Sequence, residues 1–308
     1  MPMQLDDKQR GTLLGVTAYL IWGFAALYWV QTEPVHAGDL LAHRAVWSLP
    51  FVMLCLLFAG RGRLVAALAL LRQPRTVALL GCAAFFGALN WGIFLWAVTH
   101  ERATEASLGY FLLPLVNVVI GLTLFRESID TAQKVGIAFA LAAVLLQLVY
   151  FGGLPLVALS LALSFGLYGA IRKGVKVESM EGLLLETLMM APFGIVWMIY
   201  RDGAGLGQYG MTVDVFLLGA GAFTAIPLMT YVAASRLLPL TALGLVFYIG
   251  PTAQLFVAVV VFGEPFSTVQ LLSFALVWIG LALVSLDALR RARALRNIAR
   301  RAKADPGA

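Results

Sequence analysis

The chain has 308 residues, of which 61% are hydrophobic and only 12% are charged. Ordinary soluble domains carry roughly 25% charged residues, so this composition cannot supply a polar shell, and it places the chain in the membrane class. The formal charge of +6 does not point to nucleic acid, because the basic residues cluster between apolar segments. Cys55 and Cys82 both lie in apolar stretches and carry no information on the redox compartment.

Ten apolar segments recur along the chain, and each is long enough to cross a bilayer core of roughly 30 Å as a helix. A helix satisfies its backbone amides within its own segment, as hydrocarbon requires. We therefore predict an all-α polytopic membrane protein with ten transmembrane helices. The predicted spans are 11–31, 38–59, 76–99, 104–125, 132–151, 154–171, 182–200, 213–234, 240–262 and 268–286.

The distribution of lysine and arginine predicts the orientation of these spans. With ten crossings, 19 of the 22 basic residues fall on one side and only Arg44, Arg102 and Arg201 on the other. Cytoplasmic loops carry the excess of basic residues, so we expect both termini in the cytoplasm and the protein in the inner membrane. The tail LDALRRARALRNIARRAK (286–303) is typical of a basic helix that meets anionic lipid.

An internal repeat divides the chain. Residues 110–128, YFLLPLVNVVIGLTLFRES, align with 247–265, FYIGPTAQLFVAVVVFGEP. The matched positions are Pro114 and Pro251, Asn117 and Gln254, Phe125 and Phe262, and Glu127 and Glu264. Five spans per copy is an odd number, so the second copy enters the membrane from the opposite side, as in many secondary transporters. We predict a cytoplasmic N-terminus (1–10), two inverted five-helix repeats (11–151 and 154–286) and a basic cytoplasmic tail (287–308).

Several motifs resemble a known family. They are AYLIWGFAALYW (18–29), LAHRAVWSLPF (41–51), ALNWGIFLWAV (88–98), EASLGYFLLPLVNV (105–118) and LPLTALGLVFYIGPTAQ (238–254). Over roughly residues 11–287 the chain resembles the EamA-type branch of the drug/metabolite transporter superfamily, and within it the RarD proteins. The resemblance implies ten helices in inverted repeats and export of small metabolites. Two positions depart from the RarD pattern: Ala26 stands where proline is frequent, and Leu113 where asparagine is frequent.

Charged residues inside the predicted spans are candidates for the substrate pathway. Arg44 either snorkels to the headgroups or faces a cavity and attracts an anionic group, with Glu105 as its expected partner. At the repeat offset Arg44 corresponds to Glu186, and we expect each to guard one mouth of the pathway rather than to pair directly. His43 either carries a proton or is a neutral residue bonded to a neighbour. Glu105 either exchanges a proton or stabilises a helix N-terminus.

Prolines, amides and aromatic residues at mid-depth are the other candidates. Pro114 and Pro251 each free a backbone carbonyl and bend a helix, and Asn117 and Gln254 recur beside them. The alternative is a pair of simple packing kinks. Aromatic and polar side chains can line an amphipathic pocket, although most aromatic residues in such proteins only pack or anchor the interfaces. The further candidates of this kind are Asn90, Trp91, Tyr110, Tyr231 and Tyr248.

No enzyme or cofactor motif is found in the sequence. There is no Walker loop and no Cys/His cluster with metal-ligand spacing, so we expect no catalysis, no metal and no cofactor. The expected function is secondary transport, as an exporter of a small amphipathic metabolite by alternating access. An amino acid, a related organic anion or a drug is the expected substrate. The alternative is a membrane sensor or scaffold without transport activity. Proton coupling and pairing with a second copy stay open.

Overall fold

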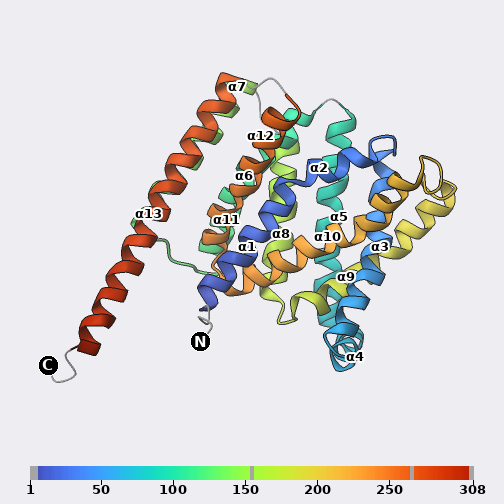
Figure 1. Cartoon of the computed structure of the whole chain (residues 1–308), viewed down its shortest axis with the longest axis horizontal. Helices are drawn as coiled ribbons and strands as arrows, with labels where there is room; N and C mark the ends of the chain where they lie inside the picture. Colours follow the sequence, from blue (N-terminus) through green and yellow to red (C-terminus); the bar gives the residue numbers. More distant parts are fainter. Residues whose placement is uncertain (1–5, 101, 153–155, 264–266, 305–308) are drawn as a thin grey trace.

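A computed structural model describes residues 6–100, 102–152, 156–263 and 267–304, and every regular element within them is helical (Figure 1). The elements in chain order are α1 (Asp7–Gly23), α2 (Ala25–Trp29), η1 (Val30–Thr32), α3 (Ala37–Phe58), α4 (Arg61–Ala69), η2 (Leu70–Arg72), α5 (Pro74–Thr99), α6 (Ala103–Thr123), α7 (Thr131–Phe151), α8 (Leu156–Gly174), α9 (Ser179–Tyr200), α10 (Met211–Leu237), α11 (Leu240–Phe247), α12 (Ile249–Phe256), the π-helical turn η3 (Val257–Val261) and α13 (Thr268–Ala304).

Eight helices in the described part of the chain are long and apolar enough to cross a membrane. The segments Asp7–Gly23 and Ala25–Thr32 form a ninth span if they are taken as one helix bent by 43°. The apolar stretch Gly109–Thr123 of α6 is the tenth segment. Large apolar side chains stay exposed on these helices, among them Val149 at 82% and Phe193 at 72%, as expected for surfaces that face lipid. The predicted all-α polytopic membrane fold is confirmed.

Two segments outside the predicted spans are also helical. Residues 7–10 belong to α1, because Asp6 and Gln9 form a capping box that starts the helix before the apolar run. The connection at 60–75 contains α4 and the short turn η2. The basic tail does form a helix, which continues α13 to Ala304.

α1 and α8, the first helices of the two predicted repeats, run in opposite directions. α1 begins beside the turn between α10 and α11, where a Cβ on Gly11 would lie 2.8 Å from Leu237 Cβ. α8 ends at the same turn, because Lys173 Nζ donates to the Leu238 carbonyl at 2.6 Å. We call this end of the bundle the basic end and the opposite end the far end. The ends of α1 and α13 nearest the chain termini both lie toward the basic end (Figure 1).

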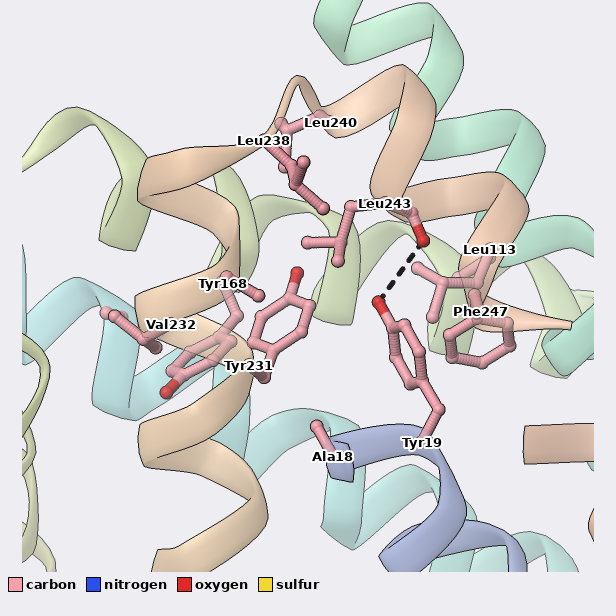
Figure 2. Close-up of a cluster of buried hydrophobic side chains, with 13 residues drawn as sticks. Ala18, Tyr19, Leu113, Tyr168, Tyr231, Val232, Leu238, Leu240, Leu243 and Phe247 are labelled. Carbon is pink, nitrogen blue, oxygen red and sulfur yellow. Dashed lines mark hydrogen bonds between the residues drawn. The ribbon is translucent and has the colours of Figure 1, made fainter. Parts of the chain in front are cut away.

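A buried aromatic and aliphatic cluster fills the centre of the bundle toward the basic end (Figure 2). Tyr19, Tyr168 and Tyr231 lie within it, each no more than 2% exposed, together with Leu240 and Leu243. The Tyr19 hydroxyl donates to the Leu243 carbonyl at 3.4 Å, which ties α1 to α11. We call this cluster the plug, because it occupies the space between the cavities described below and the turn that joins α10 to α11.

Two helices are interrupted in the membrane. α1 ends at Gly23 and α2 begins two residues later, while α11 gives way to α12 at Tyr248 and then to η3. Pro251 has no N–H, so it leaves a carbonyl without its helical partner near the second break. Irregular backbone at membrane depth is tolerated where it lines a cavity, and both breaks border one.

Candidate functional site

Two cavities of about 430 Å³ each lie between the helices. The first, here called the aromatic cavity, extends from the plug toward the far end and is bordered by both helix breaks. Its lining includes Tyr19, Trp22, Ala25, Ala26, Trp29, Arg44, Asn90, Trp91, Phe94, Tyr110, Phe165, Phe247, Pro251, Gln254 and Phe262. The second, here called the α3–α9 cavity, includes Arg44, Ser48, Trp91, Phe165, Tyr168, Glu186, Thr187, Met190, Phe193, Trp197 and Thr224. Both volumes suit a small organic molecule.

Arg44 lies on the wall between the two cavities, and Trp91 and Phe165 also border both. The Nε of Arg44 donates to Thr224 Oγ1 at 2.9 Å. The guanidinium lies over the ring of Trp91 and 4.9 Å from the centroid of Trp29. Among the described side chains no carboxylate forms an ion pair with it. The structure therefore favours the cavity-facing interpretation of Arg44 over snorkelling, since the side chain is held by neighbours inside the bundle.

Two amides supply polar atoms to the aromatic cavity. Asn90 Nδ2 donates to the Leu161 carbonyl at 2.8 Å and to Ser164 Oγ at 3.0 Å. Gln254 Nε2 donates to the Trp22 carbonyl at 3.3 Å. In each case the side-chain NH₂ group donates to a backbone carbonyl of a neighbouring helix, and this hydrogen bond fixes the orientation of the amide. Trp91, Tyr110 and Pro251, which were candidates from the sequence, line the same cavity.

His43 does not border either cavity. The ring is fully buried, its Nε2 lies 3.1 Å from the Ala204 carbonyl, and Trp47 Nε1 donates to its Nδ1 at 3.0 Å. Since Nδ1 accepts, the proton resides on Nε2, and this arrangement fixes one neutral tautomer. Of the two interpretations of His43, the structure favours the neutral residue that ties α3 to the segment after α9.

Glu186 borders the α3–α9 cavity and pairs with Arg172, whose Nε lies 2.9 Å from Glu186 Oε1. Tyr168 donates its hydroxyl to Glu186 Oε2 at 3.3 Å. Arg44 is not the partner of this acid. Both residues border the α3–α9 cavity, whereas the sequence analysis expected each of them at a separate mouth of the pathway. The sequence analysis counted Arg172 only among the 19 basic residues expected on the cytoplasmic side, and it missed the arginine's role as a buried partner of Glu186.

Three candidates are buried away from both cavities. Asn117 is 1% exposed, and neither of its amide atoms has a hydrogen-bond partner. Tyr231 is fully buried in the plug with an unpartnered hydroxyl, while the Tyr248 hydroxyl donates to the Phe111 carbonyl at 3.1 Å. Tyr248 therefore ties α12 to α6 instead of lining a pocket.

Two candidates on α6 remain. Pro114 lies where α6 packs closely against α11. A Cβ built on Gly244 of α11 would lie 3.0 Å from the carbonyl oxygen of Pro114. Glu105 lies in α6, but its side chain falls outside the described residues.

An ionic contact at the basic end was also missed. The Glu127 carboxylate accepts from the backbone N–H groups of Leu240 at 2.8 Å and Thr241 at 3.0 Å, at the start of α11. Lys173 Nζ lies 3.7 Å from the same carboxylate and donates to the carbonyls of Ser235 and Leu238 at the end of α10. The repeated Phe-x-Glu motif was the sequence signal for it, although the partner could not be read from local sequence.

Comparison with known proteins identifies the family. Residues 9–149 match the EamA-like transporter family. Protein RarD of Salmonella typhi is 38% identical over 92% of this chain and 98% of its own length. An uncharacterised transporter of Vibrio cholerae is 36% identical over 95% of this chain and 97% of its own. The chain belongs to the EamA-like transporter family. The predicted resemblance to EamA-type and RarD proteins is confirmed.

Further relatives of this EamA-like chain extend the same pattern. The chloramphenicol-sensitive protein RarD of Pseudomonas aeruginosa is 31% identical over 95% of this chain and 98% of its own length. A solved structure, described only as the crystal structure of a protein, has a TM-score of 0.68 at 23% identity. That comparison covers 90% of this chain and 98% of the other, and it shows a shared fold. Family membership makes this EamA-like chain a multi-pass membrane transporter.

Proposed function

We propose that the protein is a secondary transporter that exports a small amphipathic metabolite bearing a carboxylate, by alternating access. The observation that carries the proposal is Arg44, a charged side chain on the wall of the aromatic cavity with no carboxylate partner among the described residues. A charge inside a membrane bundle is costly unless a pathway or a ligand uses it. An amino acid or a related organic anion fits this site.

The geometry supports a carboxylate ligand. Arg44 Nε is occupied by Thr224, so the two terminal amino groups are left to meet a carboxylate, and charge-assisted bonds of this kind are stronger than neutral ones. Trp29 and Trp91 flank the guanidinium and shield it from water. Tyr110 and Phe94 offer ring faces to the apolar part of the same ligand.

Packing between the helices supports the inverted repeat. α1 of the first half contacts α10 and α12 of the second, and α8, the corresponding helix of the second half, contacts α5 and α6 of the first. The pairs α3–α9, α6–α11 and α7–α13 each join a helix to its own counterpart. A two-fold axis in the membrane plane would produce this exchange, and α1 and α8 do run in opposite directions. Such an arrangement gives two states of similar energy that open to opposite sides.

The present state is closed toward the basic end by the plug and carries its aromatic cavity toward the far end. By the positive-inside rule the basic end faces the cytoplasm of the cell, so this is the state that releases an exported substrate. The pathway through the plug must open for the cytoplasmic substrate to reach Arg44.

The test is transport by purified protein in liposomes. Arg44→Gln leaves a shorter polar side chain and removes the charge, while Arg75→Gln removes an exposed charge outside both cavities. We expect movement of amino acids such as phenylalanine above empty vesicles, a loss of at least tenfold in Arg44→Gln, and no loss in Arg75→Gln, because a charge-assisted bond is worth about 1.5–3 kcal/mol.

The carboxylate requirement has its own control. Phenethylamine has the ring and the amine of phenylalanine without the carboxylate, and it should not be transported. Equal transport of the two compounds, or full activity of Arg44→Gln, would contradict a role for Arg44 as the carboxylate site. If no compound in a panel of amino acids, organic anions and chloramphenicol is moved or bound, the sensor or scaffold alternative replaces transport.

A further inference from the structure

A second charged group lies deep in the bundle and has no part in the binding of the carboxylate. The Arg172 side chain is 0% exposed and that of Glu186 is 6% exposed, and they form an ion pair between α8 and α9. Tyr168 completes the group through its hydroxyl. We call these three residues the α8–α9 triad.

The pairing within the triad is incomplete. Arg172 Nε lies 2.9 Å from Glu186 Oε1, yet the N–H is not aligned for a hydrogen bond, and Arg172 Nη1 has no partner at all. Arg172 Nη2 donates to the Ser179 carbonyl at 3.1 Å. A buried ion pair stabilises a fold only when its geometry is good and its remaining protons are satisfied. Apolar residues would join α8 to α9 at less cost, so the triad is better explained by a charge that changes during the working cycle.

The chain is shaped to hold this arginine. A side chain at Gly182 would collide with the guanidinium of Arg172, so glycine at this position of α9 leaves the space that the arginine occupies. Any larger residue at position 182 would push the guanidinium away from Glu186. The site is therefore built from both helices.

Protons can reach the Glu186 carboxyl group through the α3–α9 cavity, which it borders. The same cavity shares Arg44, Trp91 and Phe165 with the aromatic cavity, so a substrate on Arg44 and a proton on Glu186 would occupy adjoining spaces. Arg172 lies near the end of α8, close to the basic end, where the guanidinium can gain water when the plug opens.

We propose that Glu186 is the proton-binding site that couples transport to a pH gradient. The proposal rests on the transport function given above. In the present state the carboxylate is paired with Arg172. In the state open to the basic end Arg172 turns to solvent and Glu186 takes up one proton from that side. When the pair re-forms, Glu186 releases the proton into the α3–α9 cavity, so one proton moves in the same direction as the exported substrate in each cycle and the arginine keeps its charge.

The surroundings of Glu186 hold few other charged groups. α8 contributes Tyr168 and Arg172, and α3 contributes Arg44 at the cavity wall, whereas the cavity residues from α5 and α10 are uncharged. On α9 itself Glu181 is paired with Arg63 of α4, with Nε to Oε1 at 2.8 Å. His43 is held by Ala204 and Trp47 outside the cavity.

Glu186→Gln and Glu181→Gln are a matched pair of variants, because both remove one buried, ion-paired acid from the same helix. The first measurement is infrared difference spectroscopy of the purified protein across a pH titration, which detects the carbonyl stretch of a protonated carboxylic acid. The other acids of the chain contribute to this band in all three proteins. We expect one component of it to be present in the natural chain and in Glu181→Gln and to be missing in Glu186→Gln. Identical difference spectra for the natural chain and Glu186→Gln would overturn the proposal.

The second measurement separates coupling from transport. With phenylalanine as the probe in liposomes, Glu186→Gln should lose at least tenfold of the accumulation driven by a pH gradient, while exchange of labelled for unlabelled phenylalanine continues. If the natural chain itself shows no exchange of labelled for unlabelled phenylalanine, the transport function is rejected instead. If Glu186→Gln does not yield folded protein, Arg172→Lys replaces it. That variant should shift the pH midpoint of the infrared band, and an unchanged midpoint would refute the coupling role.

Discussion

Glu127→Gln tests how the basic end is held closed. The Glu127 carboxylate accepts two backbone N–H groups at 2.8 and 3.0 Å from the first turn of α11, and Lys173 Nζ lies 3.7 Å away. Glutamine keeps one acceptor oxygen but loses the second and the charge. One charge-assisted hydrogen bond contributes about 1.5–3 kcal/mol, and the negative charge at a helix N-terminus contributes about 0.3–1 kcal/mol more. We therefore expect the closed state to lose about 2–4 kcal/mol.

A shift of that size changes the ratio of open to closed states by roughly 30- to 700-fold, since about 1.4 kcal/mol corresponds to a factor of ten. Ser235 is fully buried near the contact, and Ser235→Cys changes little in size, so it serves as the probe. In a background with Cys55→Ala and Cys82→Ser, Glu127→Gln should increase the rate of maleimide labelling at this position by at least tenfold. Glu33→Gln, an exposed acid, is the control. An unchanged rate would show that the contact does not govern opening.

Two other substitutions test the buried polar groups. Asn117→Leu removes an amide with two unpartnered atoms, so the free energy of unfolding should rise by about 1–3 kcal/mol. The control is Gln254→Leu, which loses a hydrogen bond to the Trp22 carbonyl and should give no such gain. Thermal unfolding of both variants in detergent measures the difference. His43→Ala leaves the Ala204 carbonyl and the Trp47 N–H without their partner, so it should lower thermal stability by about 1–3 kcal/mol. The pH profile of transport should stay unchanged in His43→Ala, and a shifted profile would restore His43 as a proton carrier.

Some features of the fold could be predicted because they depend on local sequence. Spans follow from the length of apolar runs. Polar and aromatic residues at mid-depth gave a candidate list from which Asn90, Trp91 and Gln254 do border a cavity, while other members of the list do not. The start of α1 was missed because the capping box of Asp6 and Gln9 extends the helix before the apolar run begins. The amphipathic α4 was missed because it lies along the basic end and never forms an apolar run of spanning length.

The site depends on contacts that local sequence does not encode. Arg172 looks like one of several basic residues at the end of a span, and only the packing of α8 on α9 reveals that it is buried against Glu186. The sequence left two interpretations of His43 beside Arg44, a proton carrier or a neutral residue bonded to a neighbour, and adjacent residues on a helix point in different directions. Arg44 therefore faces the cavities while His43 faces the segment after α9.

Asn117 and Gln254 occupy equivalent positions in the two halves, yet their environments differ. Gln254 borders the aromatic cavity, whereas Asn117 is sealed from solvent with both amide atoms unpartnered. Leaving such atoms buried costs about 1–3 kcal/mol each, and an apolar residue would avoid that cost if this were the sole state of the protein. Under the proposed alternating access, exchange of the two halves would remove this cost. In the state open to the basic end, Asn117 would take the place that Gln254 holds here, at the wall of a wet cavity. The unpartnered hydroxyls of Tyr231 and Thr241 follow the same logic, since they too lie where that cavity would open.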